Sequence, residues 1–374
     1  MATTFITPTV VAKEALMSLD NNLVLSNVVY KAYSPEFARV GSTVLVRKPH
    51  EFATVRDFVT DTTVVPQTIV ESSVAVKMDK LYDITFPITS RELSLDVQTF
   101  SEQCIAPAMR AHAQSMDALI AAEYVNFAAH YPVSATPGVG DIAGVRTQLN
   151  LNKVPFGDRS VVMHPQSEQA YIVLDAFLHA EKRGDTQALK EASMGRVFGM
   201  DWYMDQNIKT HTEDIATAPT QVGANAASAA TVIKVIGATS TSATLPKGDV
   251  FKIAGETNDK GHVLTAAAEL SGGSASVTIA PGLQSSVASG ASLTWQKTHK
   301  ANLALHKNAI ALVTAPLEPP LGGARGAVET YKGLTCRVVY DYTSSTKTNN
   351  ISIDILFGIK TLDIELGCRL CDAR

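Results

Sequence analysis

One long helical segment, from about Val97 to Ala129, most limits what this chain can fold into. Its apolar face comprises Phe100, Cys104, Ala108, Met116, Leu119, Ile120 and Phe127, with Arg110, His112, Gln114 and Asp117 elsewhere on the helix. Pro107 is expected to kink the helix or to mark its early part. At about 1.5 Å per residue the helix would run roughly 50 Å, longer than a small domain is wide, so it predicts a strut.

The first forty residues have the pattern of an arm with one short helix. Thr7 can cap this helix and Pro8 can take its first position, where a missing N–H costs nothing. The apolar stripe of the helix consists of Val11, Ala15, Leu16 and Leu19, and Asp20–Asn22 stop it. A short amphipathic helix cannot bury its own stripe, so we expect it to dock on the body or on another molecule.

An extended pattern follows from Gly41 to about Phe86. The predicted strands are Thr43–Pro49, Thr62–Val65, Gln67–Val70 and Val74–Met78. Charged side chains are spread along the whole segment, which indicates a long two-stranded hairpin. Because an isolated hairpin is marginally stable in water, this one is expected to lie on something.

Most of the remaining chain indicates mixed α/β structure. Before the long helix, Thr89–Glu92 has the form of a capping box that opens a short helix. After it come a buried strand at Ser160–Met163, a helix from His164 to about Lys182, and a turn into a strand at Gly195–Tyr203. Further β-runs are predicted at Asn302–Thr314, Thr335–Tyr340, Ile351–Phe357 and Thr361–Leu366.

Residues 213–297 differ in character from their surroundings. Between Ala216 and Leu245 the only formal charge is Lys234, and Ser, Thr, Ala and Gly dominate. Short strands are predicted at Thr231–Ile236, Asp249–Ile253, Val263–Thr265, Ser276–Ile279 and Ser292–Trp295. Their even spacing and the Gly/Pro turns favour an inserted small β-barrel or Greek key over a low-complexity, disordered segment.

Composition excludes several classes of protein without naming a function. The chain has 374 residues, which fits two or three packed units, and its 45% hydrophobic residues exclude disorder over most of the length. A net charge of -4 and 6% aromatic residues argue against tight binding of nucleic acid. No run approaches a membrane span, and the first residues lack the pattern of a signal peptide, so we expect folding in a cytoplasm.

No motif carries a clear chemistry. Cys368 and Cys371 form the only close cysteine pair, and with Cys104 and Cys336 isolated they are more simply packing residues than zinc ligands. Gly138–Ala143 matches a loose dinucleotide-binding pattern but is not expected to follow a buried strand. Six histidines are scattered singly, namely His164, His179, His211, His262, His299 and His306. We therefore expect no catalytic residues, no metal site and no cofactor.

The order of these parts and several short segments resemble one family. The segments are Val40–Pro49, Ile84–Leu93, Ile105–Met109, Gly199–Tyr203 with His211–Thr212, Lys247–Gly255, Leu303–Ala309 and Asp354–Gly358. Together they look like the P22-type branch of the major coat proteins of tailed phages, which have the HK97-type capsid fold. The resemblance runs from about Thr7 to Leu370.

The resemblance implies an α+β, HK97-type fold with a small inserted β-barrel. The implied parts are an N-terminal arm (1–40), an E-loop with flanking strands (41–86), a P-domain spine helix (87–135), the first part of an A-domain (136–212), the inserted barrel (213–297) and return strands of the A- and P-domains (298–374). This insertion is short for the P22-type branch, so which surface loops it retains is open.

The resemblance also implies a function. Copies would form hexamers and pentamers of an icosahedral virion shell around double-stranded DNA, touching the DNA without sequence specificity. Scaffolding protein and a portal protein at one vertex would be partners, no membrane would be involved, and assembly would occur in the cytoplasm of a bacterial host. In the family the hairpin lies over a neighbouring subunit, so candidate contact residues are Arg47, Lys48, Arg56, Asp57, Lys77 and Lys80.

Three alternatives stay open at this stage. Some HK97-type shells carry Lys–Asn isopeptide bonds, for which Lys77 or Lys80 with Asn349 or Asn350 would be the candidates. The chain could instead be a decoration or tail component whose barrel binds glycans or a partner. Least supported by motifs is a cytosolic enzyme with a site near His164 and Asp201.

Overall fold

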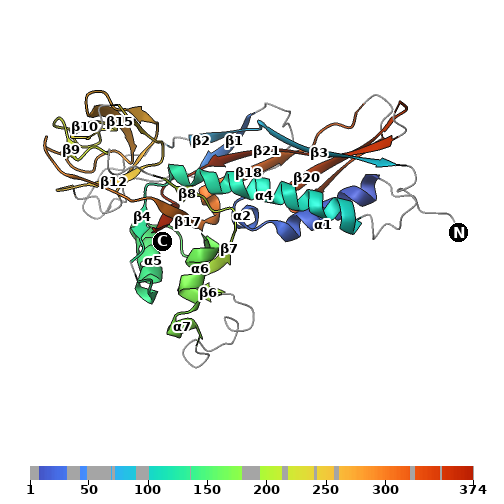
Figure 1. The fold of residues 1–374 in the computed structure, drawn as a ribbon, viewed down its shortest axis with the longest axis horizontal. Helices are drawn as coiled ribbons and strands as arrows, with labels where there is room; N and C mark the ends of the chain where they lie inside the picture. Colours follow the sequence, from blue (N-terminus) through green and yellow to red (C-terminus); the bar gives the residue numbers. More distant parts are fainter. Residues whose placement is uncertain are drawn as a thin grey trace, which may run out of the picture. The chain divides into compact units, whose positions relative to one another are not determined.

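The structure is a computed structural model that describes residues 8–31, 43–48, 69, 72–89, 101–134, 136–178, 194–212, 218–239, 242–256, 261–320, 325–345 and 348–373. Contacts between residues divide the chain into two compact units. Unit 1 comprises Met1–Ser18, Lys31–Met109 and Ala311–Leu362, and unit 2 comprises Leu19–Tyr30, Arg110–Ile310 and Asp363–Arg374. Figure 1 labels the helices and strands, whose mixture is that of the expected α+β fold.

The predicted helix of the arm is confirmed. Helix α1 runs from Pro8 to Asn22, and the four residues of its apolar stripe are at most 2% exposed. It ends at the predicted stop, and the short helix α2 (Leu25–Val28) follows. Thr7, the predicted cap, lies outside the described residues.

Unit 1 is built on a five-stranded sheet. Its strands are β3 (Lys80–Thr89), β18 (Ile310–Ala315), β19 (Arg325–Tyr331), β20 (Leu334–Thr343) and β21 (Thr348–Thr361). Strand β21 pairs antiparallel with both β20 and β3. Pro87 fits in β3 because an edge strand leaves one side of its backbone without ladder hydrogen bonds. Thr89 is the last residue of β3, so it does not cap a helix, and Ser90–Glu92 lie outside the described residues.

The predicted hairpin is confirmed at its base. Strands β1 (Thr43–Lys48) and β2 (Ser72–Lys77) pair antiparallel, from Thr43 opposite Lys77 to Lys48 opposite Ser72. The inward-facing Val46 and Val76 pack with apolar residues of β18 and β21 in one cluster. The hairpin therefore lies on the sheet of its own unit. The strands predicted at 62–65 and 67–70 lie outside the described residues, apart from Ile69.

The long helical segment ends earlier than predicted, and its predicted start at 97–100 lies outside the described residues. A π-helical turn (Ser101–Ile105) leads into α4 (Ala106–Ala122), and a 3-10 turn (Glu123–Asn126) ends it. Pro107 is the second residue of α4, which agrees with the prediction that it marks the early part of the helix. Residues 127–129 were predicted helical but are extended, because the carbonyl of Ala129 accepts the backbone N–H of Arg369 at 2.8 Å. The 17 residues of α4 span about 25 Å.

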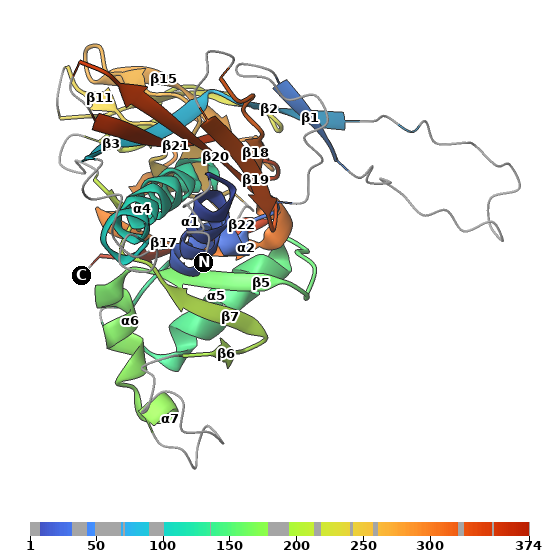
Figure 2. The ribbon, with the colours of Figure 1, turned by 90° about the vertical axis from the view of Figure 1, so that its right-hand side faces the viewer.

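Unit 2 contains a mixed sheet of seven strands, which we call the host sheet. Its strands are β4 (His130–Pro132), β5 (Arg159–Met163), β6 (Arg196–Val197), β7 (Met200–Met204), β8 (Thr210–His211), β17 (His299–His306) and β22 (Gly367–Asp372). Strands β5 and β7 run parallel side by side (Figure 2), and β4 pairs parallel with β22. Three helices pack on this sheet, namely α5 (Val139–Leu151), α6 (Pro165–Ile172) and α7 (Asp175–Leu178).

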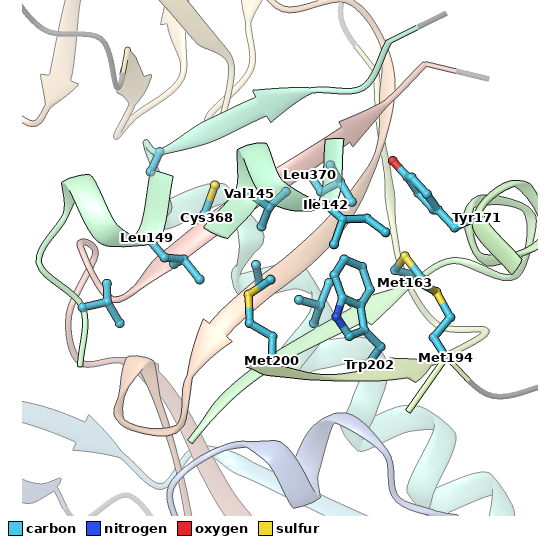
Figure 3. Close-up of a cluster of buried hydrophobic side chains, with 14 of the residues drawn as sticks. Ile142, Val145, Leu149, Met163, Tyr171, Met194, Met200, Trp202, Cys368 and Leu370 are labelled. Atoms are coloured by element: carbon cyan, nitrogen blue, oxygen red, sulfur yellow. The ribbon is translucent and has the colours of Figure 1, made fainter. Parts of the chain in front are cut away.

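One hydrophobic cluster joins these helices to one face of the host sheet. Figure 3 shows Ile142, Val145 and Leu149 of α5 meeting Met200 and Trp202 of β7. Tyr171 of α6 and Cys368 and Leu370 of β22 belong to the same cluster. Because all five residues of β5 are buried, the opposite face of the host sheet must also be covered.

Residues 218–296, which we call the barrel segment, form a separate set of strands. They are β9 (Gln221–Val222), β10 (Val232–Ile236), β11 (Thr244–Leu245), β12 (Val250–Ile253), β13 (His262–Leu264), β14 (Ala268–Glu269), β15 (Ser274–Ala280) and β16 (Leu293–Trp295). Six of them pair antiparallel in the order β16-β12-β13-β15-β10-β9. The N–H of Leu293 donates to the carbonyl of Thr220 at 2.8 Å, which joins the two ends of this order into a ring. The segment has a hydrophobic cluster of its own.

Three element boundaries differ from the sequence predictions. The helix predicted from His164 to Lys182 breaks at Val173 into α6 and α7, and residues 179–193 lie outside the described range. The run predicted at 302–314 is two strands, because the Nδ1 atom of His306 accepts the N–H of Asn308 and a 3-10 turn separates β17 from β18. Residues 362–366 form a turn before β22.

Strand β19 was not predicted at all. It pairs with β20 around a tight turn at Lys332–Gly333, in which both residues have positive φ. Its sequence, RGAVETY, carries charged side chains at Arg325 and Glu329, and all seven of its residues are partly or fully exposed. A strand at the edge of a sheet needs little apolar surface, so it gives a weak pattern in the sequence.

Candidate functional site

The outer face of the β1–β2 hairpin carries two of the predicted contact residues. Arg47 lies opposite Ser73, and Lys77 lies opposite Thr43. Between these pairs Leu45 is 65% exposed and lies opposite Ala75. Side chains of a strand alternate between faces, so Arg47, Leu45 and Thr43 point away from the buried Val46. This hairpin face, with two cations flanking an exposed leucine, is suited to contact another protein.

The other predicted contact residues are only partly placed. Lys80 begins β3, and its ammonium group lies 3.6 Å from the carboxylate of Asp79. Lys48 ends β1, but its side chain is outside the described residues, as are Arg56 and Asp57 altogether. The structure thus brings Lys77 and Lys80 close in sequence and space, and it sets Arg47 about four residues along the hairpin, roughly 13 Å away.

The candidate cross-linking residues do not meet within one chain. In the pairing of β3 with β21, Lys80 lies opposite Phe357, whereas Asn350 lies opposite Pro87. These positions are seven residues apart along β21, roughly 23 Å. An isopeptide bond between them would therefore have to join different subunits.

The residues of the enzyme alternative are also apart. The Nδ1 atom of His164 accepts the N–H of Gln166 at 3.2 Å, so the ring caps α6. Asp201 lies beside Ser160 at the other end of the neighbouring strand and 3.9 Å from the guanidinium of Arg196. Burial lowers the pKa of His164. The structure gives each residue a structural partner and does not join them into an acid–base pair.

The glycine-rich turn before α5 is hydrogen-bonded to a carboxylate of the same helix, that of Asp141. Gly138 caps the helix, and Oδ2 of Asp141 accepts its N–H at 2.9 Å while Oδ1 accepts the hydroxyl of Ser134 at 2.9 Å. The turn follows a short strand, β4, in which His130 is buried, Tyr131 is half-buried and Pro132 is exposed, so no fully buried strand precedes it. A carboxylate already bound at the helix N-terminus disfavours a pyrophosphate in the same place.

The cysteine pair lies within strand β22. Residues three apart on a strand point to opposite faces, so Cys368 faces the α5 cluster and Cys371 does not. Burial raises the pKa of both thiols, that of Cys371 to about 12, so they are protonated at neutral pH. In the described part of the chain no three His, Cys, Asp or Glu side chains are placed to hold a metal ion.

A cluster of buried polar side chains surrounds Arg369, which sequence reasoning missed. This residue of β22 is fully buried, and its Nη1 donates to the carbonyl of Gly248 in the barrel segment at 2.6 Å. Its guanidinium lies 5.1 Å from the centre of the Tyr124 ring, just beyond α4. Burial lowers the pKa of Arg369 to about 10, so it remains a cation at neutral pH.

A chain of hydrogen bonds supplies the counter-charge for Arg369. Nε2 of His211 lies 2.7 Å from Oδ1 of Asp249, and the Tyr124 hydroxyl lies 2.8 Å from Nδ1 of the same ring. A carboxylate only accepts, so Nε2 of His211 donates to Asp249, and in the neutral ring Nδ1 accepts from the Tyr124 hydroxyl. Burial raises the pKa of Asp249, against the opposing effect of its hydrogen bond to His211.

Two further histidines border this cluster. The ring of His299 lies 5.4 Å from that of His211, and its Nδ1 donates to the carbonyl of Lys297 at 2.7 Å. Burial, with Arg369, His211 and His130 nearby, lowers the pKa of His299 to about 3. His130 touches the barrel segment, since a Cβ added to Gly261 would lie 2.6 Å from its Cε1. No spacing in the sequence signals this convergence of four strands.

A second buried carboxylate fixes the arm residues of unit 2. Oδ2 of Asp117 on α4 accepts the N–H of Val24 at 2.8 Å, and Oδ1 accepts the N–H and hydroxyl of Ser26 at 2.9 and 2.8 Å. Burial raises the pKa of Asp117 to about 6 despite these donors. The sequence prediction had placed Asp117 and His112 away from the apolar face, yet both are only 2% exposed.

Comparisons with known proteins complete the description of the chain. None of the curated proteins matches it. Solved structures that resemble it include "Mycobacterium phage Che8" (13% identity, TM-score 0.49, 93% of this chain and 90% of that chain) and "Capsid structure of the Cyanophage P-SCSP1u" (10%, 0.46, 93% and 94%). A third is "Capsid of Ralstonia phage GP4" (9% identity, TM-score 0.45, 93% of this chain and 88% of that chain).

The sequence profile of one family matches most of the chain. Its description is "P22 coat protein - gene protein 5", and the match covers residues 1–258. The described helices include none long and apolar enough to cross a membrane. The matched range contains α1, the β1–β2 hairpin, α4 and the first strands of the barrel segment, in the order that the sequence predicted. The chain belongs to the P22 coat protein family, and it is a structural protein of the virion capsid.

Proposed function

We propose that copies of this coat protein associate as hexamers and pentamers into a closed icosahedral shell around double-stranded DNA. The family match over residues 1–258 carries this proposal. The arm and the hairpin support it, since their exposed faces would gain buried surface when another subunit covers them. Many weak contacts of this kind sum to a stable lattice while each remains reversible during assembly.

The hairpin face is the contact that we propose for a neighbouring subunit. Arg47 and Lys77 would pair with acidic groups of the neighbour, and Leu45 would be buried between them. Such a contact resembles the usual arrangement of an apolar centre with a charged rim. The residues between β1 and β2, including Arg56 and Asp57, would extend the same contact.

Partners other than the protein itself follow from the same proposal. A scaffolding protein would guide assembly in the cytoplasm of the host, and a portal protein would occupy one vertex. The net charge of -4 suits a container that touches its DNA through few, salt-sensitive contacts. Residues 213–297 would be an inserted domain carried by each subunit, and the protein would catalyse no reaction.

Charge reversal on the hairpin face tests the proposal. Arg47→Glu is expected to lower the yield of closed shells about tenfold, the effect of losing roughly 1.4 kcal/mol at a contact. Arg47→Lys keeps the charge and serves as the matched control, with normal assembly expected. Shells are counted by sedimentation and electron microscopy after co-expression with the scaffolding protein, and circular dichroism checks subunit folding. Normal shells from Arg47→Glu would show that the hairpin is not the contact.

A further inference from the structure

Two exposed phenylalanines lie at one end of the host sheet. Phe156, in the loop between α5 and β5, is 71% exposed, and Phe198, in the turn between β6 and β7, is 40% exposed. Strands β5 and β7 run parallel with Ser160 opposite Asp201, so both begin at the same end (Figure 2). Phe156 is four residues before Ser160. Phe198 is three residues before Asp201, so both phenylalanines lie at that end, which we call the aromatic end.

We propose that the aromatic end is a contact between subunits, on which a second copy of this chain docks. The inference rests on the proposed function, because it supposes that copies of the chain associate. It adds a contact formed by unit 2 to the one proposed for the hairpin face, which belongs to unit 1.

A buried arginine holds the loop that carries Phe156. Arg159 is 2% exposed, and its Nε donates to the carbonyl of Pro155 at 2.7 Å. Its Nη1 donates to Oδ1 of Asn150 at 2.8 Å, and its Nη2 donates to the carbonyl of Val154. The guanidinium also lies 4.9 Å from the centre of the Phe156 ring. Because the loop is held in place before binding, the ring can be buried in a contact without the entropy cost of ordering a free loop.

The turn that carries Phe198 has a backbone geometry that disfavours phenylalanine. Val197 pairs with Met200, so Phe198 and Gly199 form a two-residue turn, in which their φ angles are +51° and +76°. Turns of this type favour Asn, Asp and Gly, and a bulky side chain at positive φ is strained. Folding alone gives little reason for a phenylalanine at this position, since much of its ring is exposed. Strain of this kind is typical of positions that serve binding.

Among the described residues, nothing of the same chain covers the tips of the loop and the turn. A Cβ added to Gly157, next to Phe156, would meet nothing within 4 Å. The same holds for Gly199, next to Phe198. Single exposed apolar side chains are common on protein surfaces, but two rings at one end of one sheet, each on a restrained backbone, indicate a contact surface.

The charges around the aromatic end favour another copy of the chain as the partner. Residues of the loop, the turn and the adjoining chain ends supply the cations Arg146, Lys153, Arg196 and Lys307 and the anions Asp158, Asp201, Asp363 and Glu365. Four charges of each sign give no strong potential, such as DNA or a highly charged protein would require. A surface with both signs can match a second copy of the same chain, in which each cation has an anion to meet.

Photo-cross-linking from position 156 identifies what docks on the aromatic end. Full-length protein with p-benzoylphenylalanine in place of Phe156 is co-expressed with the scaffolding protein, and the particles are irradiated. We expect a covalent dimer of the chain, in which mass spectrometry assigns the cross-linked peptide to a second copy. The same probe in place of Leu45 reports on the hairpin face. Cross-links to another copy from position 45 but none from position 156, or a product with the scaffolding protein at 156, would overturn the inference and leave the proposed function standing.

Substitutions that spare folding measure the contact without the need for shells. Phe198→Asn suits the turn, so the urea midpoint of the subunit should stay the same or rise. Its self-association, followed by sedimentation velocity over a concentration series, should nevertheless weaken at least about tenfold, as expected for the loss of an aromatic anchor. Phe156→Ser should weaken association similarly, whereas Phe156→Tyr keeps the ring and serves as the matched control.

The two kinds of failure are distinguishable. Association of Phe198→Asn and Phe156→Ser as strong as that of the parent protein would overturn the inference, whether or not shells form. A parent protein that neither associates nor forms shells would contradict the proposed function and the inference together.

Discussion

Two buried charged residues, Asp117 and Arg369, hold distant segments of the chain together. Asp117 holds three donors from residues 24–26, and Arg369 is held by a carbonyl, an aromatic ring and the chain from Asp249 to Tyr124. A buried charge costs several kcal/mol unless such partners are fixed in place. These residues therefore act as checks on correct packing, since a displaced segment would leave a charge buried and unpaired.

Asp117 should make stability depend on pH in an unusual direction. Its pKa is about 6 in the folded protein, whereas the ordinary pKa of an aspartate is 3.8, so the folded protein takes up the proton first as pH falls. Its contribution therefore grows between pH 6 and 4 and is lost as pH rises through 6, by up to about 3 kcal/mol. Asp117→Asn cannot titrate. Urea unfolding should therefore show that the free energy of unfolding of the wild type increases relative to that of the variant as pH falls from 7 to 4.

The stability of Asp117→Asn is compared with that of the wild type at each pH. The amide nitrogen of Asp117→Asn would face the N–H of Val24, so the variant is expected to be less stable at every pH. Only the change of the difference with pH reports the titration. A difference that stays constant from pH 7 to 4 would mean that Asp117 has an ordinary pKa.

Some helices and strands lie so close to a neighbouring side chain that only glycine fits at the point of contact. In the sequence such a contact is visible only as a glycine. In α5 a Cβ on Gly144 would lie 2.3 Å from the ring of Tyr131, whereas a Cβ on Gly140 would meet nothing within 4 Å. Gly144 thus allows the helix to lie directly on β4. Similarly, a Cβ on Gly367 would lie 2.4 Å from the ring of Phe127, which fixes where β22 can begin.

The two glycines of α5 make a matched pair of substitutions. Gly140→Ala is expected to stabilise the protein by up to about 1 kcal/mol, the ordinary gain of alanine in a helix. Gly144→Ala should instead destabilise it by about 1–3 kcal/mol, since overpacking outweighs that gain. Thermal or urea unfolding measures both, and Gly144→Ala behaving like Gly140→Ala would contradict the close approach to Tyr131.

Local pattern was sufficient for most elements and failed where distant residues decide. The stripe of α1, the buried strand β5 and the five barrel strands were predicted because their periodicity is local. The end of α4 was predicted too late because a hydrogen bond from Arg369, more than 200 residues away, takes the carbonyl of Ala129. The cluster of His130, His211, His299 and Arg369 was missed for the same reason. These residues are far apart in the sequence, and only the order of the strands in the host sheet brings them together.

At the scale of the whole molecule, the barrel segment and the host sheet have separate interiors within unit 2. Their hydrophobic clusters share no residue. Each contains or touches one of the two tryptophans of the chain, Trp202 in the host cluster and Trp295 against the barrel cluster. Trp295 also donates to the carbonyl of Pro219 at 2.6 Å, so its environment reports on the closure of the barrel ring.

Single-tryptophan proteins should therefore unfold in two distinguishable steps. Trp295→Phe leaves Trp202 as the probe of the host sheet, and Trp202→Phe leaves Trp295 as the probe of the barrel segment. We expect different midpoints in urea because separate cores lose their packing independently. Far-ultraviolet circular dichroism of both proteins controls for the substitutions, and coincident midpoints would show one cooperative core.

The pairing of β8 with β17 has a consequence for how such a chain could acquire an added domain. His211 lies directly opposite His299, so the backbone leaves the host sheet and returns to it on the same rung of the ladder. Whatever lies between these two residues leaves the rung unchanged, and doubling its length costs only about 0.6 kcal/mol in closure entropy. At this rung a foreign sequence would be accepted provided that it supplies a carboxylate to His211 and a carbonyl to Arg369.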